Sequence, residues 1–96
     1  MRLRIKRTGG LAGVALRGQL DTASLGAAEA ADVEAAVRDL SGGSPSGAPP
    51  PDGFRYEIAP LDEDSGVEPI VIDEREMPAA LKEPVRSAVR AGEIEP

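Results

Sequence analysis

The residues best suited to binding chemistry lie in one glycine-rich segment near the start of the chain. Residues 7–13 read RTGGLAG, which places one large apolar side chain, Leu11, among small residues. Glycine leaves the backbone bare, so another surface can closely approach its N–H and C=O groups. Such a segment offers a partner backbone hydrogen bonds and one apolar anchor. The alternative is a loop that only turns the chain.

Two alternating segments flank the glycine-rich segment and must position it. Residues 2–7 and 12–20 alternate apolar and polar side chains, which is typical of strands with one buried face. Two strands joined by a short glycine-rich segment indicate a β-hairpin. A phosphate-binding loop is disfavoured, because such a loop is followed by a helix and has a different glycine spacing.

The rest of the chain carries two helix patterns and two strand patterns. Residues 27–40 and a segment that begins near Pro78 have the spacing of amphipathic helices, and residues 54–61 and 67–73 are further strands. Pro69 lacks a backbone donor, which predicts either an edge strand or a nitrogen that points to solvent. Pro84 is expected to kink the second helix or to split it. Gly18 predicts a bulge or close helix packing.

This order of elements predicts an α+β fold. We expect a four-stranded antiparallel sheet with two helices packed on one face, in the order ββαββα. Residues 1–96 form a single domain, with a flexible Gly/Pro-rich loop over 41–53 and a tail over 93–96. The strand order within the sheet stays open. The expected core consists of Leu3, Ile5, Val14, Leu16, Leu20, Val33, Val37, Leu40, Phe54, Tyr56, Ile58, Ile70, Ile72, Leu81, Val85 and Val89.

The composition excludes several classes of site. The chain has neither Cys nor His, which removes disulfides, a catalytic zinc site and Ser-His or Cys-His nucleophiles. We therefore expect no enzyme, no cofactor and no bound metal. No apolar run is long enough to cross a membrane and no signal peptide is found, which predicts a cytoplasmic protein without membrane contact. We expect a monomer.

Charge is distributed unevenly along the chain. The net charge is −6, yet Arg2, Arg4, Lys6 and Arg17 lie on the first hairpin and every acid follows from Asp21 onward. The outward face of the hairpin is therefore basic, either as a solvated sheet face or as a guide toward an acidic protein partner. Nucleic acid is a poor candidate, because the chain is acidic overall and has one Phe and one Tyr as its only aromatic residues.

The first hairpin resembles the opening of emfourin-type proteins. RTGGLAG over residues 7–13 and VALRGQLDT over 14–22 are similar to the family pattern of R-T-G-G-[apolar]-A-G before an alternating strand that ends in Asp-Thr. Three later segments resemble the family in the same order, namely FRYEI over 54–58, IVID over 70–73 and MPAALKEPV over 77–85. The resemblance covers nearly the whole chain.

This resemblance implies an inhibitor of thermolysin-like zinc metallopeptidases such as protealysin. These enzymes prefer a bulky apolar residue just after the scissile bond, which Leu11 would supply. The resemblance implies a partner-binding loop made of Arg7, Thr8, Gly9, Gly10, Leu11, Ala12 and Gly13. Two alternatives stay open: the turn at 62–66 enters the cleft instead, or the chain is a non-inhibitory protein–protein interaction module that uses the basic open sheet face.

Overall fold

The elements follow one another as two strands, a helix, two strands, a helix and a final short strand. The computed structural model describes residues 1–9, 15–43, 53–62, 64 and 66–94. The strands are β1 (Arg2–Gly9), β2 (Leu16–Asp21), β3 (Phe54–Pro60), β4 (Ile70–Asp73) and β5 (Glu93–Ile94), and the helices are α1 (Ala27–Leu40) and α2 (Ala79–Arg90). Two 3₁₀ turns, Thr22–Ser24 and Glu74–Glu76, precede the helices.

The strands form one antiparallel sheet in the order β4-β3-β1-β2-β5. The expected four-stranded antiparallel sheet and the order ββαββα are confirmed. The sequence leaves the strand order open. In the structure β1 lies at the centre of the sheet, between β2 and β3. The two-residue strand β5 pairs with β2 and adds a fifth strand, in the segment that the sequence analysis treats as a tail.

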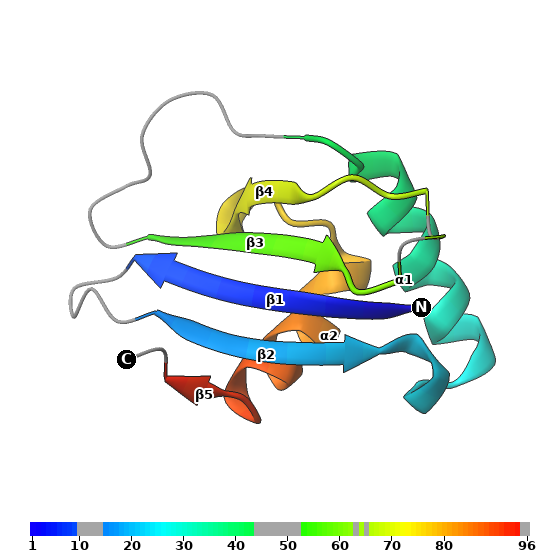
Figure 1. Ribbon diagram of the computed structural model, residues 1–96, viewed down its shortest axis with the longest axis horizontal. Coiled ribbons are helices and arrows are strands. Elements are labelled where there is room, and N and C mark those ends of the chain that lie inside the picture. Colours follow the sequence, from blue (N-terminus) through cyan, green and yellow to red (C-terminus); the bar gives the residue numbers. More distant parts are fainter. Residues whose placement is uncertain (10–14, 44–52, 63, 65, 95–96) are drawn as a thin grey trace.

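The core lies between the sheet and the two helices, which cover the same face of the sheet (Figure 1). Most of the expected core residues are buried, and Val67, Met77 and Ala88 complete the core. Leu16, Leu40 and Phe54 are only partly buried. Val14 lies outside the described residues. The buried members of the expected set are Leu3, Ile5, Leu20, Val33, Val37, Tyr56, Ile58, Ile70, Ile72, Leu81, Val85 and Val89.

Two prolines affect the secondary structure differently. β4 lies at the edge of the sheet, as Pro69 predicts, but it begins only at Ile70 because Pro69 has no N–H to contribute to the ladder. Of the two outcomes expected at Pro84, a kink or a split, the split is wrong, since α2 continues through Pro84. Pro84 removes a single helical hydrogen bond, to the carbonyl of Ala80, and its ring is buried.

Gly18 allows helix α2 to pack directly on strand β2. A Cβ atom at this position would collide with the carbonyl oxygen of Ala88 in α2. The close helix packing expected at Gly18 is therefore confirmed, and Gly18 pairs with Ile5 in an uninterrupted register without a bulge. This contact fixes the last turns of α2 beneath the first hairpin.

Candidate functional site

The glycine-rich segment leaves the sheet where three strand ends meet. β1 ends at Gly9, β2 begins at Leu16, and β3 begins at Phe54, which pairs with Gly9. We call this edge the loop end of the sheet; it lies at the left of Figure 1. Four residues of the expected binding loop, Gly10, Leu11, Ala12 and Gly13, lie outside the described residues. The structure therefore describes the base of the loop, formed by Arg7, Thr8 and Gly9.

Arg7 fastens the base of the loop to the neighbouring strand. Its guanidinium carbon lies 4.3 Å from the centroid of the Phe54 ring, a cation–π contact. Its Nε atom is buried and has no hydrogen-bond partner among the described residues. The expected pairing of Arg7 with an acid of an enzyme stays a prediction, and within the chain Arg7 already positions the loop.

Thr8 and Gly9 tie the base of the loop to residues 53–55. The hydroxyl of Thr8 donates a hydrogen bond to the carbonyl of Arg55, at 3.4 Å. Gly9 has a φ of +100°, and a Cβ atom there would lie 2.5 Å from the carbonyl oxygen of Gly53. Position 9 therefore requires glycine. Gly53, the first described residue after the Gly/Pro-rich segment, therefore lies next to Gly9 at the base of the first loop.

A buried carboxylate joins the elements around the loop end. Asp73, at the end of β4, is buried and accepts a hydrogen bond from Arg55 Nε at 2.9 Å. A guanidinium nitrogen of Arg75 lies 3.7 Å from its second oxygen. The sequence analysis did not identify this cluster, because Arg55 and Asp73 become neighbours only through the pairing of β3 with β4.

Tyr56 lies beneath the loop base, directly opposite Arg7 in the strand pairing. It is buried, and its hydroxyl makes no hydrogen bond of good geometry among the described residues, although the Arg7 side chain lies close enough to interact with it. Burial raises the pKa of the Tyr56 phenol, and the negative charge of Glu74 raises it further. Hydrogen bonding with the side chain of Arg7 acts in the opposite direction and lowers the pKa, as do the positive charges of Arg7 and Arg86. The phenol therefore stays neutral at physiological pH.

Three arginines surround a hollow beside the loop end, which we call the arginine hollow. Arg7 comes from β1, and Arg86 and Arg90 come from α2. Leu16, Val89 and Gly92 complete the walls, and the hollow has a volume of about 590 Å³. The sequence analysis overlooked Arg86 and Arg90. Their four-residue spacing places them on one side of the helix, which is the signal that could have identified them.

The turn that was considered as an alternative site lies at the opposite end of the sheet. We call this the turn end, where β1 begins and β3 ends. Asp62 accepts a hydrogen bond from the backbone N–H of Arg2 at 3.1 Å, and its other oxygen lies 3.4 Å from the Arg2 guanidinium. The backbone hydrogen bond lowers the pKa of the Asp62 carboxyl, and the Arg2 guanidinium lowers it further.

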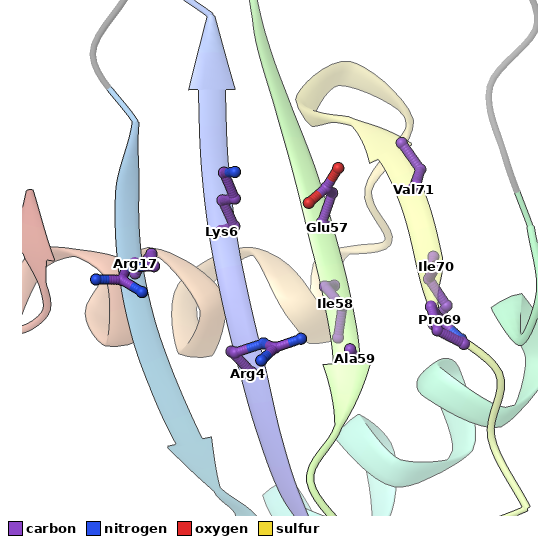
Figure 2. A pocket seen from close by; sticks show the side chains of 9 residues that line it. All are labelled: Arg4, Lys6, Arg17, Glu57, Ile58, Ala59, Pro69, Ile70 and Val71. Carbon is purple, nitrogen blue, oxygen red and sulfur yellow. The ribbon is translucent and has the colours of Figure 1, made fainter. Parts of the chain in front are cut away.

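Figure 2 shows three of the expected basic residues, Arg4, Lys6 and Arg17, on the face of the sheet opposite the helices. Arg4, Lys6 and Arg17 line an open hollow of about 470 Å³ on this open face. Lys6 lies between Arg17 of β2 and Glu57 of β3 in the strand pairing, so the face contains an acid as well. Arg2 is already paired with Asp62. The open face is therefore less strongly basic than the sequence alone suggests.

One family comparison decides what kind of protein this is. The emfourin family matches residues 5–88, from β1 to α2. The chain belongs to the emfourin family. No curated protein and no solved structure matches it. The three later segments that resemble emfourins fall in β3, in β4 and at the start of α2.

Emfourins are known as metalloprotease inhibitors, so the family implies a protease as the protein partner and an inhibitory rather than a catalytic role. The match includes residues 7–13 and half of the residues that line the arginine hollow, namely Arg7, Leu16 and Arg86. Within the described part of the chain, no acidic side chains gather in a group of three that could hold a metal ion. No helix described by the structure is long and apolar enough to cross a membrane.

Proposed function

We propose that this emfourin inhibits a thermolysin-like zinc metallopeptidase by placing residues 7–13 in the active-site cleft. Membership of the family carries this proposal. The loop sequence supports it, because a single Leu among glycines offers a bulky apolar group on a backbone that can lie close to an enzyme. An extended backbone of this kind can add hydrogen bonds along the edge of a cleft.

The strands that flank the loop support a role as a stable inhibitor rather than as a substrate that the peptidase cleaves. Three glycines do not make a loop rigid, so the flanking structure must hold it. Arg7 pairs with both Leu16 of β2 and Tyr56 of β3, and Leu16 pairs in turn with Ile94 of β5. The strands that bear the loop are thus each flanked by a further strand. Stacking of Arg7 on Phe54 adds a side-chain contact to this frame.

Leu11 alone cannot account for tight inhibition. Burying a leucine side chain contributes about 1.5–3 kcal/mol. Nanomolar affinity corresponds to roughly 12 kcal/mol. The surface around the loop end must therefore supply the larger part of the binding free energy, through backbone hydrogen bonds and through charged side chains beside the loop.

The first test compares two leucine variants in an inhibition assay with a thermolysin-like peptidase and a small peptide substrate. Leu11→Glu is expected to raise the inhibition constant by about tenfold to a hundredfold, because it removes an apolar group worth about 1.5–3 kcal/mol. Leu61→Glu is the matched control. Leu61 is 37% exposed and belongs to the turn end, so its variant is expected to inhibit like the wild type.

Each other outcome points to a different interpretation. Loss of inhibition by Leu61→Glu with Leu11→Glu unaffected would place the site at the turn end. A wild-type protein that inhibits no such peptidase would favour the interaction module. That interpretation expects reversal of the charges of Arg2, Arg4 and Arg17 to abolish partner binding, while Leu11→Glu leaves it intact.

A further inference from the structure

The arginine hollow lies directly beside the base of the loop, on the helix side of the sheet. Arg7 is two residues from Gly9, where the described part of β1 ends, and Leu16 is the first residue of β2. Arg86 and Arg90 approach from α2, which packs on β2 at Gly18. Any protein that receives the loop will therefore lie close to these three guanidinium groups.

The hollow gathers more positive charge than its surroundings balance. Arg86 and Arg90 are one helical turn apart, a spacing at which like charges destabilise a helix. Glu74 offsets Arg86 at 3.2 Å, but among the described residues Arg90 forms no ion pair. The end of a helix favours a positive residue such as Arg90. That effect does not explain why Arg7, from another element, lines the same hollow.

The chemistry of the hollow suits a carboxylate. Arginine presents a planar fork of N–H donors that matches the two oxygens of a carboxylate. Arg7 adds a third positive charge although its Nε is buried, and the donors open to an incoming carboxylate are those of Arg86 and Arg90, which are exposed. Leu16 and Val89 contribute apolar surface to walls that are otherwise mainly polar.

We propose that the arginine hollow binds the carboxylate of an Asp or Glu on the surface of the protein that receives the loop. Arg90 and Arg7 supply the open positive charge, and Arg86 exchanges part of its contact with Glu74 for the incoming group. The identity of the partner rests on the proposed function, whereas the affinity of the hollow for a carboxylate does not.

The first experiment titrates the protein with a tetraglutamate peptide with blocked termini, followed by the NMR shifts of backbone amides. Because the protein has a net charge of −6, it repels this probe except where positive charge is concentrated. Saturable shifts are expected for Leu16, Val89 and Gly92. The double variants Arg86→Glu/Arg90→Glu and Arg86→Gln/Arg90→Gln are expected to weaken binding about tenfold or more.

The open face provides the matched control. Arg4→Glu/Arg17→Glu makes the same change in charge on the other side of the sheet, away from the arginine hollow, and is expected to leave the affinity for the peptide within about twofold. Shifts that centre on Gln19 and Ala59, or that survive both substitutions at 86 and 90, would overturn the proposal. So would the absence of saturable shifts in the wild type.

The second experiment measures association with a thermolysin-like peptidase at low and high salt. Arg86→Glu/Arg90→Glu is expected to slow association about tenfold at low salt, and the difference should shrink at high salt. The open-face variant Arg4→Glu/Arg17→Glu is expected to associate as fast as the wild type. If the wild type inhibits and both variants associate with the peptidase as fast as the wild type does, the arginine hollow does not contact the peptidase. If the wild type does not inhibit, the proposed function fails, while the peptide titration still decides the hollow.

Discussion

The two ends of the sheet differ in how completely their polar groups are paired. Among the described residues, no buried side-chain polar atom at the turn end lacks a hydrogen-bond partner. At the loop end, Arg7 Nε has no partner among them, the Tyr56 hydroxyl interacts only with the Arg7 side chain, and three arginines share one hollow. The contrast indicates that the turn end is organised for stability, while the loop end keeps donors that a partner can use.

A small network organises the turn end. The buried Thr22 hydroxyl lies 2.7 Å from a carboxylate oxygen of Glu34 and accepts a hydrogen bond from the amino group of Met1 at 2.9 Å. Glu34 also pairs with Arg38 one helical turn later, at 3.7 Å. This network joins the start of the chain to α1. The ion pair between Arg2 and Asp62 joins β1 to the chain after β3.

Matched glycine substitutions should give the largest difference between the two ends. Gly9 and Gly66 both have positive φ, but a Cβ at Gly9 meets the Gly53 carbonyl whereas a Cβ at Gly66 meets nothing within 4 Å. Gly9→Ala is expected to lower the free energy of unfolding by about 3 kcal/mol, and Gly66→Ala by about 1 kcal/mol. Urea denaturation measures both. Equal losses would show that the loop base is not tightly fixed.

Removing one buried hydroxyl at each end should give opposite results of moderate size. Thr22→Val deletes a paired hydroxyl and leaves Glu34 and the Met1 amine without it, so the free energy of unfolding should fall by about 2 kcal/mol. Tyr56→Phe deletes a hydroxyl that makes no hydrogen bond of good geometry among the described residues and interacts only with the Arg7 side chain. Its free energy of unfolding should stay equal or rise by up to about 1 kcal/mol. A large loss in Tyr56→Phe would contradict the contrast between the ends.

Local patterns predicted the elements well. The spacing of Val33 and Val37, with Glu29 early and Arg38 late, gave the bounds of α1 as observed. Alternation gave the faces of β1 and β3, and Gly18 indicated the helix contact. The helix and strand patterns depend on residues close in sequence, and Gly18 is the exception, because its contact is with Ala88. The proposed binding loop also comes from one local motif, residues 7–13, and its role stays a prediction.

Side-chain clusters that depend on the exact strand register or on where a helix lies could not be predicted. Arg55 and Asp73 meet only in the register of β3 with β4. The arginine hollow requires α2 to run continuously through Pro84 and to pack on β2, so that Arg86 and Arg90 reach Arg7. β5 has two residues, too few to show any periodicity. In each case the decisive contact joins residues that are far apart in the chain.

The smallest expected effect is a pH dependence that arises at the turn end. The Arg2 backbone N–H and guanidinium hold the pKa of Asp62 below its ordinary value. A carboxyl with a lowered pKa in the folded state contributes stability above its unfolded pKa of about 3.9, and this contribution is lost as the pH falls through the folded value. Because the side chain of Asp62 is 39% exposed, solvent screening keeps the contribution small. Asp62→Asn should therefore have a slightly lower urea midpoint than the wild type near neutral pH, and the two midpoints should converge as the pH falls below about 4. A difference that grows toward acid pH would contradict the assignment, whereas convergence would show that the Arg2–Asp62 pair helps to close this end of the sheet.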